Sequence, residues 1–148
     1  MAQILIDTNV LVYACDPADA ARQDRALDIL KQLDVTRSGR LSVQNLAEFI
    51  HVTTHTRCPL FTRGEALLQV EALLRSFLVF DLTPLIVLEA ARGARDYSLA
   101  YYDAQIWAAA RLNQVPVILS EDFTDGQTLE GVRFVNPFGG NFKVEDWV

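Results

Sequence analysis

Short apolar segments alternate along the whole chain with longer segments of helical periodicity, and this alternation limits the possible folds most strongly. Strands are expected at residues 3–7, 40–43, 77–81, 115–119 and 132–135. Helices are expected from Pro17 onward and at 44–56, 63–75, 84–97 and 103–111. Because the strand segments are apolar on both faces, they predict a parallel β-sheet covered by helices on both sides, an α/β class fold.

The length of 148 residues fits a single domain over 1–148, in which residues 139–148 form a C-terminal tail. Hydrophobic residues make up 51% and charged residues 22%, which excludes a disordered chain and a coiled coil. We expect no membrane segment, because every apolar run is shorter than the roughly 20 residues that cross a bilayer. The N-terminus lacks the pattern of a signal peptide. Two cysteines, Cys15 and Cys58, predict a cytoplasmic protein with both thiols in the core.

The formal net charge of −6 disfavours a nucleic-acid partner when it is taken alone. Most of the 13 basic residues are nevertheless arginines, whose planar guanidinium groups suit phosphate contacts. An Arg-rich rim around an acidic pocket is therefore conceivable, although each arginine is better explained as a surface charge or an ion pair such as Arg92–Asp96. The candidate rim residues are Arg37, Arg40, Arg57, Arg63, Arg92 and Arg95.

Carboxylates follow the predicted strands where ligand sites of parallel sheets occur. Asp7 ends the first strand, Asp122 follows the fourth, and Asp103 heads a helix. Two carboxylates about 4 Å apart repel by roughly 4 kcal/mol at an effective dielectric constant of 20, so such a cluster favours a cation. Oxygen ligands of this kind suit Mg²⁺ or Mn²⁺.

Each carboxylate also has a purely structural interpretation. Asp7 and Asp103 are placed to cap helices, and Asp122 lies in a polar loop that suits a turn. Glu48 falls nearly opposite the apolar side of its helix, which Leu46, Phe49 and Ile50 would form. Periodicity alone therefore places Glu48 in solvent or in a wet cleft, favours solvent, and does not bring this residue into a site.

Four segments in order carry a resemblance to a known family: IDTNVLVY at 6–13, NLAEF at 45–49, AYYDAQI at 100–106 and LSED at 119–122. The chain resembles the PIN-domain nucleases, and within them the VapC-type toxins of bacterial toxin–antitoxin pairs. RFVNPF at 133–138 is similar to the end of many such chains. The resemblance implies a sheet between two helical layers and an acidic Mg²⁺ site. It assigns the metal ligands and catalytic residues as Asp7, Glu48, Asp103 and Asp122, the neighbouring hydroxyls as Thr8 and Ser120, and Asp125 as a residue that assists or replaces Asp122.

The implied activity is a Mg²⁺-dependent (or Mn²⁺-dependent) endoribonuclease that hydrolyses RNA phosphodiester bonds. Three of the acids would hold a first ion, and Asp122 would help to hold a second or orient the attacking water. The implied partners are the RNA substrate, a VapB-like antitoxin and a second copy of the chain in a homodimer. Leu67, Leu68, Leu73 and Leu74 exceed what one helix face needs, which fits either an interface or a well-buried helix.

Other interpretations stay open at this stage. The same fold can be a catalytically silent PIN-like binding module, in which the acids are caps and surface charges. His51 and His55 lie one helical turn apart and could serve metal-free cleavage or bind a transition metal, although two exposed histidines are the simpler interpretation. Tyr101 and Tyr102 can stack on bases, whereas Trp107 is expected in the core or at an interface.

Overall fold

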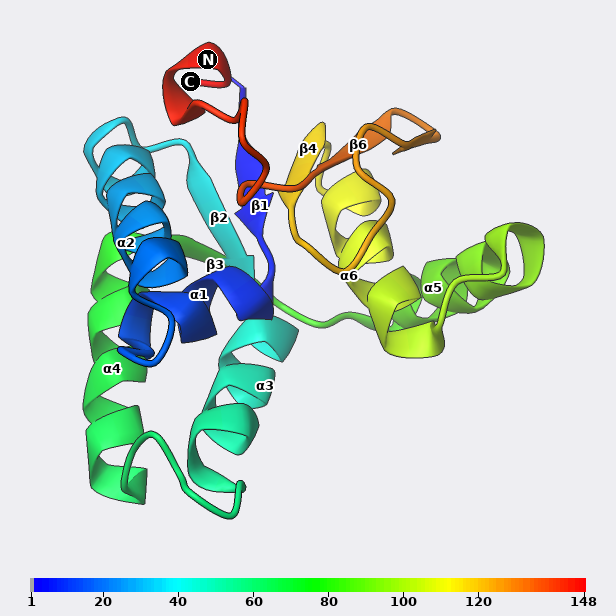
Figure 1. Cartoon of the computed structure of the whole chain (residues 1–148). Coiled ribbons are helices and arrows are strands. Elements are labelled where there is room, and N and C mark those ends of the chain that lie inside the picture. Colours follow the sequence, from blue (N-terminus) through cyan, green and yellow to red (C-terminus); the bar gives the residue numbers. More distant parts are fainter. Residues whose placement is uncertain (1) are drawn as a thin grey trace.

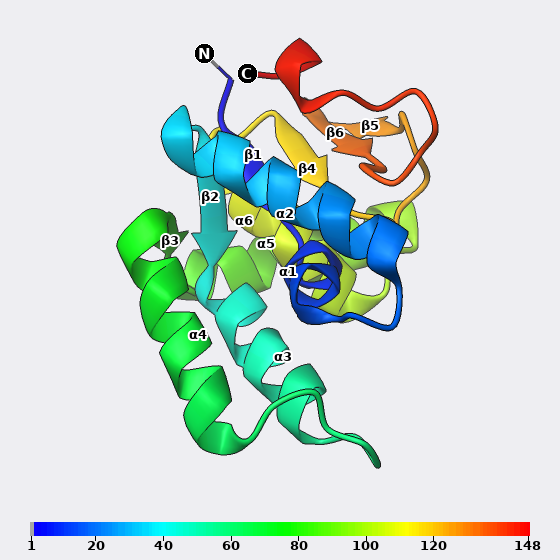
Figure 2. The same ribbon diagram turned by 60° about the vertical axis from the view of Figure 1, so that its left-hand side comes forward.

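The computed structural model describes residues 2–148, which form one six-stranded sheet. The strand order is β3-β2-β1-β4-β6-β5, and every pairing is parallel except that of β5 with β6. Figure 2 shows α2 crossing in front of β1 and β2. The strands are β1 (Ile4–Ile6), β2 (Gly39–Ser42), β3 (Leu78–Phe80), β4 (Val117–Leu119), β5 (Thr128–Leu129) and β6 (Val132–Val135).

Helices form a layer on each side of the sheet (Figure 1). Helices α1 to α4 lie on one side, and α5 and α6 pack together on the other. The helices are α1 (Thr8–Cys15), α2 (Ala20–Val35), α3 (Val43–Thr54), α4 (Arg63–Ser76), α5 (Pro84–Tyr97), α6 (Tyr101–Leu112) and the short 3-10 helix η1 (Val144–Asp146). No helix within residues 2–148 is long and apolar enough to cross a membrane.

The two cores follow from the period-2 alternation of the central strand. Ile4 and Ile6 of β1 are fully buried in the core that includes residues of α1 to α4. Leu5, between them, is buried in the opposite core with Trp107 of α6. The sequence prediction of a sheet covered on both faces is confirmed, because β1 contributes to both cores.

Three details differ from the sequence prediction. The chain adds β5, which pairs antiparallel, so the sheet is not wholly parallel. Helix α2 begins at Ala20, after the cap Asp19, and buries Ala26, Ile29 and Leu33 while Leu27 is 49% exposed. Cys58 is exposed, so the expectation that both cysteines lie in the core is wrong for this residue.

The C-terminal tail packs against the molecule instead of extending from it. Val144 is buried in the same core as β1. Arg25 of α2 donates to the carbonyl oxygens of Pro137 and Phe142, each over 3.1 Å. The tail therefore packs against α2. Its position was not predictable from the sequence.

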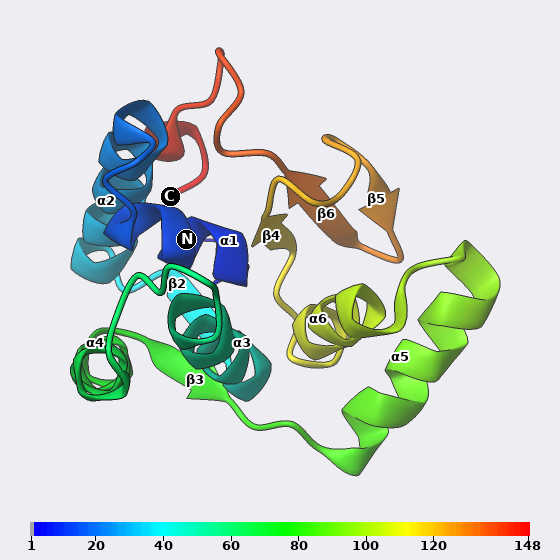
Figure 3. The ribbon, with the colours of Figure 1, turned by 60° about the horizontal axis from the view of Figure 1, so that its bottom comes forward.

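The chain order reverses between β1 and β4. From β1 the chain adds β2 and then β3 on one side, whereas β4 lies on the other side of β1. In sheets of this kind, ligands bind at the carboxyl ends of the strands next to such a reversal. Figure 3 views the molecule from this end, where α1, α3 and α6 begin close to one another.

Candidate metal centre

Asp7 lies at the carboxyl end of β1, at the reversal point, and is 5% exposed. Its Oδ1 accepts a hydrogen bond from the Thr8 backbone N–H over 2.8 Å, so the prediction that Asp7 caps α1 is confirmed. Its Oδ2 accepts from the hydroxyl of Ser120 over 2.7 Å. This second bond joins the ends of β1 and β4 and fixes the carboxylate between them.

Glu48 lies beside Asp7 and not in open solvent, which corrects the assignment from helical periodicity. The hydroxyl of Thr8 donates to Glu48 Oε2 over 3.0 Å and accepts from Asn45 Nδ2 over 3.3 Å. Gln44 Nε2 donates to Glu48 Oε1. Helix α3 starts at the end of β2 and packs against α1. Because α3 packs against α1, Glu48 reaches Thr8 although it lies opposite the buried Leu46 and Phe49.

Asp122 follows β4 in an exposed loop and is linked to the cluster through Asn9. Asn9 Nδ2 donates to Asp122 Oδ2 and to Ser120 Oγ, each over 3.1 Å. Ser120 Oγ also accepts from the backbone N–H of Asp122 over 3.1 Å. Ser120 therefore donates one bond and accepts two, which makes it the centre of the polar network.

Asp103 lies in the first turn of α6 and is partly buried. The residue before the helix is Ala100, and α6 has no side-chain cap. The structural alternative for Asp103, that it caps the helix, is therefore wrong. Gln44 Nε2 donates to the Tyr102 carbonyl oxygen over 3.0 Å, which holds this turn against α3. Asp103 and Glu48 line the same cavity.

The four carboxylates interact electrostatically. Burial raises the pKa of Asp7 to about 6, and the negative charges of Glu48 and Asp122 add to this effect. Burial also raises the pKa of Asp103, as do the charges of Asp122 and Glu48. Within residues 2–148, none of the four forms an ion pair with Lys, Arg or His. The cluster is thus negatively charged and without a protein cation.

The donor set fits a hard divalent cation, although the side chains are not arranged as a finished coordination shell. As they stand, no three acidic, His or Cys side chains within the described part of the chain converge on one ion. Thr8, Asn9 and Ser120, which are neutral, bind three of the carboxylates instead. Asn9 Oδ1 is buried without a donor from residues 2–148, so it offers a further oxygen. All of these groups are of the type that Mg²⁺ and Mn²⁺ prefer.

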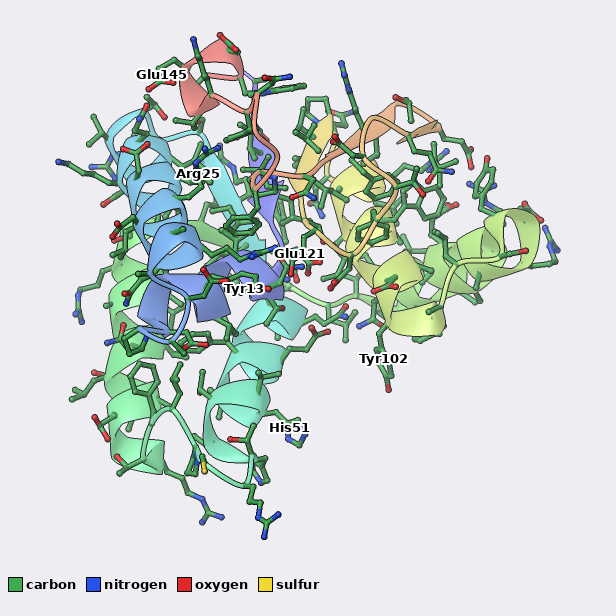
Figure 4. The ribbon with its side chains drawn as sticks, viewed as in Figure 1. Tyr13, Arg25, His51, Tyr102, Glu121 and Glu145 are labelled. Atoms are coloured by element: carbon green, nitrogen blue, oxygen red, sulfur yellow. The ribbon has the colours of Figure 1, made fainter. Side chains whose placement is uncertain are left out.

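A second network holds the loop that carries Asp122. The hydroxyl of Tyr13 on α1 donates to Glu121 Oε1, and Arg22 Nε of α2 donates to Glu121 Oε2 over 3.3 Å. The side chains of Tyr13 and Glu121 are both labelled in Figure 4. The carboxylate of Glu121 raises the pKa of Tyr13 through this bond. The loop after β4 is therefore fastened to both α1 and α2.

The six candidate arginines fit the favoured interpretation as surface charges or ion pairs, and no contact of theirs with the acidic cluster is present within residues 2–148. Arg37 and Arg40 lie at the start of β2, at the edge of the sheet opposite the acidic cluster. Arg92 and Arg95 are engaged in ion pairs, and the expected Arg92–Asp96 pair is present at 3.4 Å. Arg57 and Arg63 are exposed beyond the end of α3 and at the start of α4.

Other predicted residues lie outside the acidic cluster. Asp125 Oδ1 accepts from the Asn136 backbone N–H over 2.9 Å, so this carboxylate stabilises the end of β6. His51 and His55 are exposed and stack on each other, with ring centroids 4.6 Å apart. Trp107 is fully buried, as expected of a core residue.

Sequence reasoning missed the amide residues of the site. Asn9 stands inside the recognised segment 6–13, which was its only signal. Asn45 forms a capping box with Ser42, in addition to its bond to Thr8. Gln105 stands inside the segment 100–106, whereas Gln44 has no local signature; the roles of both depend on the approach of α3 to α6.

A family model described as "PIN domain" matches residues 4–124. The chain belongs to the PIN domain family. The match ends before β5, so the family model leaves β5, β6 and the tail of this PIN domain unmatched. A search of curated proteins gives no match.

Three solved structures show what this PIN domain is similar to. VapBC2 from Rickettsia felis, bound to a promoter DNA fragment, has 12% identity and a TM-score of 0.66, with 88% of this chain and 96% of that chain covered. FitAcB from Neisseria gonorrhoeae has 19% identity and a TM-score of 0.66, with 92% and 99% covered. VapC20 from Mycobacterium tuberculosis, a sarcin-ricin loop cleaving toxin, has 18% identity and a TM-score of 0.64, with 86% and 98% covered. These similarities establish the fold.

Proposed function

We propose that this PIN domain is a divalent-metal-dependent endoribonuclease and the toxin of a VapBC-type pair. The observation that carries the proposal is the buried Asp7 carboxylate at the reversal point of the sheet. Its pKa is raised to about 6 by burial and by Glu48 and Asp122, and it has no cationic partner within residues 2–148. A nuclease needs a site that holds a cation next to the scissile phosphate. The cation reverses the negative field of the carboxylates, so that the negatively charged phosphate can approach them. The cleavage of the sarcin-ricin loop by the similar VapC20 supports RNA as the substrate.

In the proposed mechanism, Asp7, Glu48 and Asp103 would hold a Mg²⁺ or Mn²⁺ ion, and Asp122 would help to hold a second ion or orient the attacking water. A bound divalent cation lowers the pKa of a coordinated water and stabilises charge on the scissile phosphate. Thr8 and Ser120 act as positioning residues, since each donates a hydrogen bond to one of the carboxylates. Asp122 is exposed, which gives it access to a water that approaches from solvent.

The proposed protein partner is a VapB-like antitoxin. An apolar cavity of about 350 Å³ lies among α1, α2, α3 and α4, lined partly by Leu30, Phe49 and Leu73. Such a cavity suits the apolar side chains of a partner segment, and a similar solved structure from Klebsiella pneumoniae is a toxin–antitoxin complex. Leu67, Leu68 and Leu74 of α4 are exposed, so α4 is not the fully buried helix that was the alternative. We propose that the exposed leucines serve contacts with the antitoxin or with a second copy in a homodimer.

The first experiment compares thermal unfolding of the wild type with that of Asp103→Asn, with and without Mn²⁺ at matched ionic strength. An ion at ten times its dissociation constant stabilises the protein by about 1.4 kcal/mol, and each kcal/mol shifts the Tm by roughly 2–4 °C. We expect this shift in the wild type, its loss in Asp103→Asn, and its retention in the control Asp24→Asn, which changes an exposed carboxylate on α2.

Cleavage of total bacterial RNA, mapped by new 5′ ends, then tests the activity with the same three proteins. Cleavage by the wild type and Asp24→Asn, but not by Asp103→Asn, is the expected result. An equal Mn²⁺ shift in all three proteins would contradict the metal site. A metal shift without any RNA cleavage would instead favour the catalytically silent binding module.

A further inference from the structure

A second cavity adjoins the acidic cluster, between the first turns of α3 and α6. Its volume is about 540 Å³. Val43, Ala47 and Leu82 contribute apolar lining, and the ring of Tyr102 forms part of the wall. Tyr102 is 67% exposed, and Figure 4 shows it projecting away from the body of the protein below α6. The cavity is therefore open to solvent and offers an aromatic face to an incoming group.

The buried amides that line this cavity already have hydrogen-bond partners. Gln105 Nε2 donates to Gln44 Oε1 over 2.8 Å, and Tyr101 donates from its hydroxyl to Gln105 Oε1 over 3.0 Å. Gln44 Nε2 donates to Glu48 and to the Tyr102 carbonyl oxygen. An occupant would therefore meet mainly apolar surface and satisfied polar groups, so the cavity selects for shape and a flat apolar face.

The position of the cavity restricts what the occupant can be. Glu48 and Asp103, two of the proposed metal ligands, line it as well. An occupant thus lies directly beside the place where the scissile phosphate would bind. A nucleobase has a flat apolar face, is joined to a phosphate through its ribose, and stacks on exposed aromatic rings in a sequence-tolerant way.

We propose that this cavity holds one unpaired nucleobase of the RNA substrate, stacked on Tyr102, next to the bond that is cut. The inference rests on the proposed ribonuclease function and adds a specificity-determining residue to it. A base in an RNA duplex is already stacked and paired, so the cavity restricts cleavage to unpaired nucleotides in loops, bulges or single strands. Because the lining amides are engaged, selection among the bases follows size and stacking strength.

The test uses AMP as the probe, with ribose 5-phosphate as the matched ligand that lacks a base, on the whole chain in Mg²⁺ buffer. NMR follows the ring signals of Tyr102 and the methyl signals of Leu82 during each titration. AMP is expected to shift both sets of signals in a saturable way, whereas ribose 5-phosphate leaves them unchanged. Tyr102→Ala should weaken AMP binding about tenfold or more, because it removes one stacking partner.

Two variants separate stacking from general damage. Tyr102→Phe keeps the ring and should retain AMP affinity within about twofold. Leu88→Ala, at an exposed position of α5 that does not line the cavity, should retain it as well. Equal shifts with AMP and ribose 5-phosphate, or full AMP affinity in Tyr102→Ala, would overturn the proposal.

The remaining outcomes separate this proposal from the proposed function. RNA cleavage by a protein that shows no AMP response at Tyr102 would overturn the base site and leave the nuclease intact. AMP binding with the expected variant pattern, but without RNA cleavage, would support the base site and contradict the nuclease. Shifts of the Tyr102 and Leu82 signals with protein concentration alone would assign this face to contact between two copies, and would overturn the base site.

Discussion

Gln105 Nε2 of α6 donates to Oε1 of Gln44 on α3 over 2.8 Å, and this bond connects the two helices that carry Glu48 and Asp103. Both amide side chains are buried. Gln44 in turn donates to the Glu48 carboxylate and to the Tyr102 carbonyl oxygen. The relative position of two acids that are distant in sequence therefore depends on one pair of neutral side chains.

Replacing Gln44 with Met should lower the free energy of unfolding by about 1–3 kcal/mol, because it leaves Nε2 of the buried Gln105 without its hydrogen-bond acceptor. The Mn²⁺-induced shift in Tm should also decrease, since Glu48 loses a hydrogen bond that orients it. Urea unfolding of Gln44→Met, Gln105→Met and the double variant measures the coupling. We expect the double variant to lose less stability than the two single variants together. Additive losses would show that the two amides act independently.

In the metal-free protein, the contribution of Asp7 to stability should be lost as the pH rises from about 4 to about 6. The pKa of Asp7 is about 6 in the folded protein and 3.8 as a model value, so the folded state binds this proton more tightly than the unfolded chain. The contribution is favourable below both values and is lost as the pH rises through them. The difference between these two pKa values corresponds to about 3 kcal/mol, which is an upper bound. The conversion applies because Asp7 is only 5% exposed, so solvent screens its charge little.

Asp7→Asn checks the origin of this pH dependence. In EDTA the variant should be more stable than the wild type at pH 7 and should show a flatter profile between pH 4 and 6. The gain should remain below the upper bound, because the neutral amide loses the charge-assisted bond from Ser120. Asp24→Asn serves as the control for the loss of one carboxylate. Identical pH profiles of wild type and Asp7→Asn would refute the assignment.

Gly93→Ala should destabilise the packing of α5 on α6. A Cβ at position 93 would lie 2.5 Å from Cζ3 of Trp107, and the indole ring has little freedom to move. It is fully buried, and its Nε1 donates to the Leu129 carbonyl oxygen over 3.1 Å. Overpacking of this kind costs about 1–3 kcal/mol, measured as a lower urea midpoint.

Gly64→Ala is the matched control for the same change in another helix. A Cβ there would meet no atom nearer than Thr62 Oγ1 at 4.0 Å. We expect this variant to be more stable than the wild type by about 0.4–1 kcal/mol, because alanine reduces the freedom of the unfolded chain. Equal stability losses in both glycine variants would contradict the role of the Trp107 contact.

The sequence predicted the parts of the site that have local causes. Asp7 follows a buried strand and caps the next helix, and both features can be recognised from neighbouring residues. The apolar pattern of residues 3–7 and 115–119 predicted buried strands of a parallel sheet, whose carboxyl ends carry Asp7 and Asp122 at the same edge. The assignment of Glu48 needed the family resemblance, because helical periodicity places it opposite Leu46 and Phe49.

The sequence by itself determined the class of fold, the order of strands and helices, and the accumulation of carboxylates at one edge of the sheet. These properties follow from hydrophobic periodicity and capping, which act over a few residues. Only the tertiary structure decided that Glu48 faces Asp7, that Asp103 caps nothing, and that Gln44 and Gln105 connect their helices. Each of these depends on how α3 and α6 pack beside β1. Such packing is fixed by contacts between segments about 40 to 110 residues apart in the chain, such as Thr8–Glu48 and Asp7–Ser120.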